Sequence, residues 1–194
     1  MHFTLADLIT DITQNGAESG AVLVELDVNE TVDPESGRSR LGFTVKDNGK
    51  GMTPEQLKRA QDPFVTDGIK HPNRKVGLGL PFLIQTAEQS GGGWTMESVK
   101  GEGTTVSAWF DLGNVDTPPI GDVPGLFRTV LMFEGPAEMI IRRVKDYKPP
   151  DGQDVMRNEY EIRKTELADA LGGLEDTQSL ILMGQYLHSL EEIS

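Results

Sequence analysis

Four short motifs carry the residues of this sequence that could do chemistry. In chain order they are Asn15, Asp47-x-Gly49-x-Gly51, Gly77-x-Gly79 and Gly103-Thr104-Thr105. A carboxylate accepts hydrogen bonds from amines, and glycine-rich turns that open a helix offer backbone amides to phosphates. Either glycine motif alone is most often a simple turn. Their order and spacing together are much more specific, and they indicate a nucleotide pocket.

The patterns around these motifs predict the elements that position them. Leu5, Leu8, Ile9 and Ile12 follow helical spacing, so we expect an amphipathic helix over 4–19 that carries Asn15 in its last turn. Alternating apolar residues predict strands over 21–28 and 41–45, joined by a polar hairpin loop over 29–40. Further along we expect a helix that starts after Thr53 and ends at Pro63, a helix over 81–90, and a hairpin of strands over 94–99 and 104–112.

The composition changes after Leu112, where residues 114–125 are rich in Asp, Pro and Gly. We interpret this segment as a connection between a domain over 1–112 and a smaller α/β extension over 113–194, whose role the sequence does not indicate. In the extension we expect strands over 127–134, 138–147 and 158–162, and helices over 164–171 and 177–193. Two interpretations stay open: its strands extend the sheet and its last helix packs as core, or that helix docks on a partner.

The composition excludes several classes of site. The chain has 194 residues, no cysteine and three histidines, so disulfides and zinc-thiolate sites are excluded and a histidine-built metal site is disfavoured. A net charge of −13 disfavours nonspecific binding to nucleic acid, because phosphate backbones are bound by basic surfaces. Without a leader or a long apolar run, we expect a cytoplasmic protein without a membrane span.

The motifs resemble those of the GHKL ATPase superfamily, which includes DNA gyrase, the heat-shock chaperone, histidine kinases and MutL. The resemblance covers residues 4–112. Residues 11–17 are similar to its N box, 47–52 to its first glycine box, 62–64 to its F box, 77–80 to its second glycine box and 101–105 to its third. It implies an α+β fold, a two-layer sandwich of the Bergerat type with a mixed, mostly antiparallel sheet and helices on one face. It also implies ATP and Mg²⁺ as cofactors.

Within that resemblance, the adenine contacts fall on the first and third glycine boxes. The Asp47 carboxylate would accept a hydrogen bond from the exocyclic amine of adenine, which guanine replaces with an oxygen. Either Thr104 or Thr105 would complete this contact, partly through water. Gly49 and Gly51 would let the backbone approach the base, because no Cβ stands in the way.

The phosphate contacts fall on the N box and the second glycine box. The side-chain oxygen of Asn15 would bind Mg²⁺, a hard cation that also takes phosphate oxygens. Amides at a helix start would bind the phosphates, and a basic loop with Lys70, Arg74 and Lys75 would form a lid. The binding set expected in this part of the chain is Lys75, Gly77, Leu78, Gly79 and Leu80.

Whether ATP is cleaved depends on Asp11. The gyrase and MutL branches have a glutamate four residues before the N-box asparagine, and here that position is Asp11, which could act as the base for water. Glu18 stands where many histidine kinases have a lysine. Two functions therefore stay open: slow hydrolysis or phosphate transfer to a partner protein, and a nonenzymatic module that changes partner binding with nucleotide.

The sequence contains no histidine in the context of a phospho-acceptor, so any acceptor is expected on another chain. Residues 62–83 resemble most closely a group of small stand-alone bacterial ATP-binding proteins without a sensor, some of them encoded beside iron-only hydrogenase genes. This suggests a link to hydrogenase-type metabolism. Homo-oligomerisation stays open.

Overall fold

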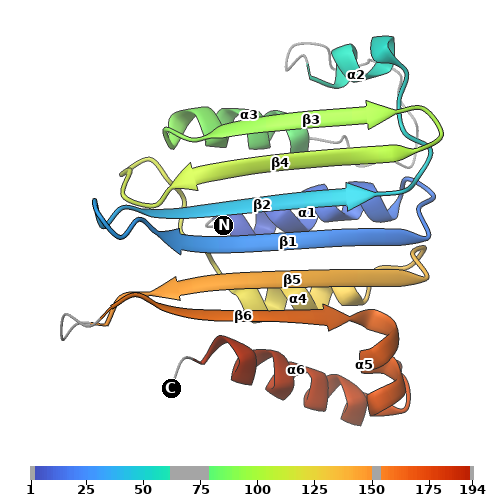
Figure 1. The fold of residues 1–194 in the computed structure, drawn as a ribbon. Coiled ribbons are helices and arrows are strands. Elements are labelled where there is room, and N and C mark those ends of the chain that lie inside the picture. The colour runs from blue at the N-terminus through green and yellow to red at the C-terminus, as the bar shows by residue number, and fades with distance from the viewer. Residues whose placement is uncertain (1–2, 62–78, 150–153, 193–194) are drawn as a thin grey trace.

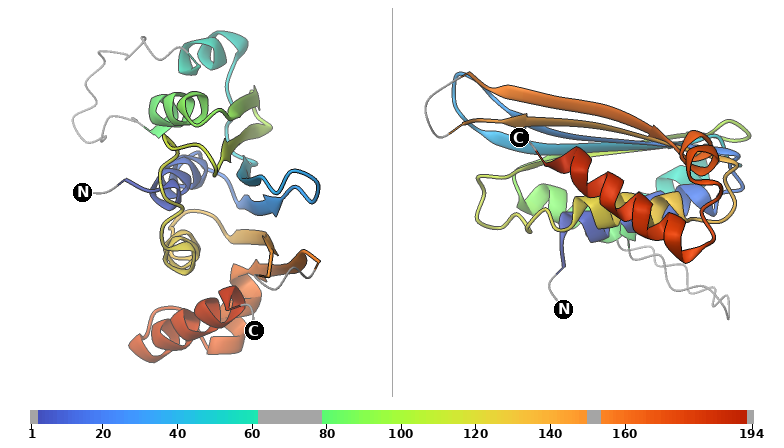
Figure 2. Two further views of the ribbon diagram at one scale, coloured as in Figure 1. Left: turned by 90° about the vertical axis from the view of Figure 1, so that its left-hand side faces the viewer. Right: turned by 90° about the horizontal axis from the view of Figure 1, so that it is seen from below.

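The chain folds into one six-stranded sheet with helices packed on one face (Figure 1). The computed structural model describes residues 3–61, 79–149 and 154–192. Figure 2 shows that α1, α3, α4 and α6 all lie on the same side of the sheet. In chain order the elements are α1 (Leu5–Ala17), β1 (Leu23–Val32), β2 (Ser39–Asp47), α2 (Pro54–Ala60), α3 (Gly79–Gln89), β3 (Gly93–Val99), β4 (Gly103–Asp111), α4 (Val123–Leu131), β5 (Glu138–Tyr147), β6 (Met156–Arg163), α5 (Lys164–Leu171) and α6 (Thr177–Glu191).

The sheet is mixed and mostly antiparallel, with the strand order β3-β4-β2-β1-β5-β6. The parallel pair is β1 with β5, and the four other neighbouring pairs are antiparallel. The predicted fold class, a two-layer α+β sandwich with helices on one face, is thus confirmed. Because β5 and β6 continue the sheet beyond β1, the strands after residue 112 extend it. The domain boundary at residue 112 stays a prediction.

Helix α6 packs as part of the core. Its Met183 and Leu187 side chains are fully buried, and they belong to the same apolar cluster as the core residues of α1 and β1. Of the two interpretations left open for the last helix, the structure therefore supports packing as core.

The expected strand over 127–134 is wrong, because this stretch lies mostly in helix α4. The Asp122 side chain accepts a hydrogen bond from the Gly125 amide, and a proline stands in the first helical turn. The buried residues of α4 then recur at helical spacing against α1 and α6. They are Val123, Leu126, Phe127, Val130 and Leu131.

Helix α1 has the local signals that the sequence indicated. Thr4 and Asp7 form a capping box, in which each side chain bonds the backbone amide of the other residue. The apolar stripe of α1 is buried against the sheet. The predicted loop over 29–40 is shorter in the structure, because β1 continues to Val32 and β2 begins at Ser39.

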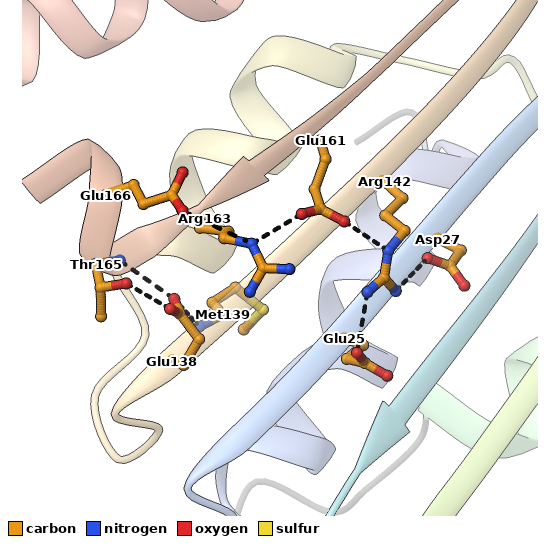
Figure 3. A network of polar contacts seen from close by, with 9 residues as sticks. All are labelled: Glu25, Asp27, Glu138, Met139, Arg142, Glu161, Arg163, Thr165 and Glu166. Carbon is orange, nitrogen blue, oxygen red and sulfur yellow. Dashed lines mark hydrogen bonds and ion pairs between the residues drawn. The ribbon is translucent and has the colours of Figure 1, made fainter.

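The uncovered face of the sheet carries an ion network across three strands (Figure 3). The Arg142 guanidinium on β5 lies 3.1 Å from Glu25, 3.3 Å from Asp27 on β1 and 2.8 Å from Glu161 on β6. Hydrogen bonds to these carboxylates, that to Glu25 first, raise the pKa of Arg142. The pairs are partly exposed, so each contributes little energy.

The helix-covered face carries a buried counterpart around Arg143. The Arg143 side chain is fully buried and lies 2.7 Å from Glu30 of β1 and 3.0 Å from Glu191 at the end of α6. The Tyr160 hydroxyl donates to Glu191 over 2.6 Å. Burial and the Glu191 carboxylate raise the pKa of Tyr160, which keeps it a donor. This cluster anchors the end of α6 to β1, β5 and β6.

Candidate functional site

A cavity of about 310 Å³ lies where the expected motifs meet. Its walls come from the end of α1, the end of β2 with the turn that follows, the first residues of α3, and the β3–β4 hairpin. This volume is at the lower end of the range for small-molecule pockets. The lining residues are Ile12, Asn15, Gly16, Glu18, Ser19, Val45, Asp47, Lys50, Gly51, Met52, Leu80, Met96, Thr104 and Val106.

Asp47 is the buried carboxylate of this cavity, with 6% of its surface exposed. Its Oδ1 accepts a hydrogen bond of 2.8 Å from the Gly49 amide and lies 2.9 Å from the Ser19 hydroxyl. The Asn48 side chain points the other way, accepting hydrogen bonds from the Val22 and Leu23 amides at the start of β1. Hydrogen bonds therefore hold this turn both to the end of α1, through Asp47, and to the start of β1, through Asn48.

The two glycines of this turn have a packing role beside the expected one, because a side chain at either position would clash with the protein. A Cβ on Gly49 would lie 1.9 Å from Ser19 Oγ, and a Cβ on Gly51 would lie 1.9 Å from the Val99 carbonyl oxygen. Gly51 also has a positive φ of 54°. The absence of a side chain at both positions thus lets the turn pack against the rest of the protein. Gly51 lines the cavity as well.

The third glycine box places its two threonines on opposite faces of the sheet. Thr104 pairs with Asp47 across β4 and β2, whereas Thr105 pairs with Lys46. Directly paired residues share a face, and neighbours alternate, so Thr104 shares the cavity with Asp47 and Thr105 faces away. Ser98 Oγ lies 2.9 Å from Thr104 Oγ1 and accepts a hydrogen bond from the Met52 amide.

The N-box residues lie where α1 meets the start of α3. Asn15 lines the cavity. A Cβ on Gly79 would lie 3.3 Å from Asp11 Cβ and 3.9 Å from Asn15 Nδ2, so the first turn of α3 packs closely against this face of α1. Asp11 is exposed, one helical turn before Asn15, and it is not among the lining residues. Leu80 adds an apolar wall.

Part of the predicted site lies outside the described residues. This part comprises the F box over 62–64, the basic lid residues Lys70, Arg74 and Lys75, and Gly77 and Leu78. Within the described ranges, no group of three or more metal-binding side chains occurs. A divalent cation beside Asn15 would take its other ligands from water and from a bound phosphate, which is how Mg²⁺ commonly binds with nucleotides.

Several lining residues had no role assigned from the sequence, although Lys50 and Met52 lie within the first glycine box. Ser19 and Lys50 add polar groups near Asp47, and Met52 and Met96 add apolar surface. Ser19 follows Asn15 by one helical turn, and its spacing from that predicted site residue was the signal that could have found it. Met96 lies on the inward face of an ordinary hairpin strand and had none.

Comparison with known proteins identifies the family. Residues 2–114 match the model of the family described as histidine kinase-, DNA gyrase B- and HSP90-like ATPases. The chain belongs to this family. The matched region includes α1 through β4, and so all the elements that form the cavity. The ATPase family membership agrees with the resemblance that the motifs indicated.

The curated relatives to which the chain is similar include histidine kinases. It is 37% identical over 78 residues to the sensor histidine kinase ZraS of Salmonella typhimurium, which is 39% of this chain and 15% of that kinase. It is 30% identical over 112 residues to the peroxide stress-activated histidine kinase mak2 of Schizosaccharomyces pombe, which is 55% of this chain and 5% of mak2. The chain thus matches only a small part of each relative's length.

A solved structure of the histidine kinase domain from the blue-light activated histidine kinase EL346 of Erythrobacter litoralis aligns with 46% of this chain and 33% of that one. The identity is 21% and the TM-score is 0.28. Among the described residues, no helix combines the length and hydrophobicity that a membrane crossing requires.

Proposed function

We propose that this protein binds Mg-ATP in the cavity between α1, β2 and the β3–β4 hairpin. The observation that carries the proposal is the convergence of Asn15, Asp47, Thr104 and Leu80 on one cavity within a family of ATPases. Asp47 supplies an acceptor at one end of the cavity. Asn15 and the start of α3 lie at another part of its wall, where a helix N-terminus favours negative charge.

The residues present fit adenine at the Asp47 end. Val45, Met52, Met96 and Val106 provide apolar surface for the faces of a base, and the Asp47 carboxylate provides an acceptor for its exocyclic amine. An apolar slot with one buried acceptor favours adenine over guanine, because guanine has an oxygen where adenine has the amine. Because the chain has a net charge of −13, the anionic phosphates of ATP would have to be held by local groups, such as the N-terminus of α3.

At the phosphate end, the Asn15 side-chain oxygen would contribute one ligand to Mg²⁺, which would neutralise charge on the phosphate oxygens. We propose that Asp11 accepts a proton from water as the water attacks the terminal phosphorus and ADP departs with the bridging oxygen. Phosphate transfer to a partner protein is the corresponding reaction of histidine kinases, the class to which the named relatives belong.

Titration calorimetry with Mg-ATP and Mg-ADP tests this function. We expect binding by the wild-type protein and a loss of about 1–3 kcal/mol of binding free energy in Asp47→Asn, because the amide replaces one acceptor oxygen with a donor. Asp111→Asn, at the other end of the sheet, is the matched control and should bind as the wild type does. Equal ATP affinity in all three proteins would contradict the proposed site.

Incubation with γ-labelled ATP, alone and with cell lysate, separates the outcomes that follow binding. Released phosphate indicates hydrolysis, and label on a second protein indicates transfer. Binding without either product would favour a nonenzymatic nucleotide-dependent module.

A further inference from the structure

We propose that Ser19 is a positioning residue that aims the Asp47 carboxylate and thereby sets the preference of the cavity for adenine. The inference rests on the proposed function, since it assigns a role to a residue in the same cavity. Ser19 is half-buried just beyond the end of α1, and it reaches Asp47 at the end of β2, 28 residues later in the chain.

The Asp47 side chain needs such a partner to hold one orientation. Rotation of a carboxylate about its last torsion angle is broad, so the backbone alone does not fix the plane of its two oxygens. In the structure Oδ1 has two neighbours at hydrogen-bond distance, the Gly49 amide at 2.8 Å and Ser19 Oγ at 2.9 Å. With Oδ1 engaged in this way, Oδ2 is the oxygen left to accept a hydrogen bond from a ligand.

The Ser19 hydroxyl has one proton and two acceptors in range. Its oxygen lies 2.7 Å from the Gly16 carbonyl oxygen and 2.9 Å from Asp47 Oδ1. A hydrogen bond to a carboxylate is charge-assisted and stronger than one to a neutral carbonyl, so the proton is drawn to Asp47. Because Gly16 lies in the last turn of α1, the end of this helix also contacts the Ser19 hydroxyl.

The contact between Ser19 and Asp47 requires a glycine at position 49. A Cβ at residue 49 would lie 1.9 Å from Ser19 Oγ and 2.9 Å from Asp47 Oδ1, so any side chain there would occupy the space in which the two groups meet. The Lys50 amide also donates to the Ser19 carbonyl oxygen over 3.2 Å. Ser19 is therefore bonded to the turn through both its backbone and its side chain.

The test compares ATP with purine riboside triphosphate, which has the same base without the exocyclic amine. We expect the wild-type protein to bind ATP more tightly than this analogue. Ser19→Ala should reduce that ratio about tenfold. The ratio measures the hydrogen bond from the adenine amine to the Asp47 carboxylate, and a hydrogen bond to a charged group contributes at least this factor. Its affinity for the analogue should stay within about twofold of the wild type, which also reports that the cavity is intact.

Ser189→Ala is the matched control. Ser189 Oγ lies 2.7 Å from the carbonyl oxygen three residues earlier, near the end of α6, as Ser19 Oγ lies 2.7 Å from the Gly16 carbonyl oxygen near the end of α1. Ser189 lies far from the cavity along the chain, so this variant loses a hydroxyl in the same kind of local contact and should keep the wild-type ratio of affinities.

The remaining outcomes overturn the inference. A Ser19→Ala protein that keeps the wild-type ratio, or that loses affinity for both nucleotides by the same factor, has lost only a structural contact. If the wild type binds ATP and Asp47→Asn weakens that binding, either of these Ser19→Ala outcomes overturns only the role of Ser19 and leaves the adenine contact of Asp47 in place. A wild-type protein that binds no ATP, or that binds both nucleotides equally, overturns the proposed adenine contact together with the inference.

Discussion

Asp47 and Thr104 stand directly opposite each other on β2 and β4, and both side chains line the same cavity. The next residue along β4, Thr105, pairs with Lys46 and faces the uncovered side of the sheet. Two identical side chains, adjacent in sequence, are thus separated by the sheet itself. This arrangement makes them a natural pair for testing which threonine contacts the ligand.

Thr104→Val should weaken ATP binding by about 1 kcal/mol, because valine has the shape of threonine but leaves the hydroxyl's hydrogen bonds unmade. Thr105→Val removes a hydroxyl on the other face and should leave the affinity unchanged. Calorimetry on both variants measures the difference. If Thr105→Val is the weaker binder, the pairing of Thr104 with Asp47 does not determine the contact.

Gly49→Ala tests whether the turn depends on a missing side chain. The new methyl group would overlap Ser19 Oγ, so we expect a loss of about 1–3 kcal/mol in unfolding free energy from overpacking, with weaker ATP binding. Gly184→Ala on α6 is the control, because among the described residues its new Cβ would meet nothing within 4 Å beyond its own stretch of helix, and alanine favours a helix by about 0.8–1 kcal/mol. Chemical denaturation of both variants gives the values. A Gly49→Ala protein as stable as the wild type would show that the turn can move.

Local signals predicted much of the fold. The capping residue Thr4 and the helical stripe after it predicted α1, and period-two alternation predicted the hairpin of β3 and β4, each within a few residues of the observed ends. The error at α4 came from treating residues 114–125 as connection only. Asp122 and the proline after it lie in that segment, and they are the signals that start the helix.

The sequence predicted only those site residues that lie in recognisable motifs. Asp47 and Asn15 were named from order and spacing, and the structure places both at the cavity. The choice between Thr104 and Thr105 needed the register of β4 against β2, which a single sequence does not contain. The contact of Ser19 with Asp47 depends on how the chain turns after α1, a long-range relation that no local pattern encodes.

Glu191 links acid stability to the buried cluster around Arg143. Burial alone would raise the pKa of Glu191, but hydrogen bonds from Arg143 and Tyr160 outweigh it, so the pKa lies below its ordinary value of 4.5. A carboxyl whose folded pKa is lowered stabilises the protein above its unfolded pKa, and this contribution is lost as the pH falls through the folded value. Wild-type stability should therefore drop as the pH falls below 4.5.

In Glu191→Gln this part of the pH dependence should disappear, and the variant should be about 1–3 kcal/mol less stable near neutral pH, because Arg143 loses a charged partner. Thermal unfolding at a series of pH values measures both effects. Glu192→Gln makes the same change in charge at the next residue, whose side chain is exposed, and should keep the wild-type profile. Parallel profiles for wild type and Glu191→Gln would contradict the role of this carboxylate.

Asp11 separates an ATPase from a module that only binds. It lies on the α1 face that meets Gly79, one turn before Asn15, and so beside the part of the cavity wall assigned to the phosphates. If its carboxylate accepts the proton of the attacking water, Asp11→Asn should reduce hydrolysis at least a hundredfold, the usual contribution of a general base, with ATP affinity nearly unchanged. Asp7→Asn makes the same substitution one turn earlier, at the third helical residue, and should lower stability slightly through loss of a negative charge in the first turn, without changing turnover per folded molecule. Phosphate release and calorimetry on the same samples give both quantities. Equal hydrolysis by wild type and Asp11→Asn would exclude Asp11 as the base, because an amide cannot take up the proton that the reaction must release.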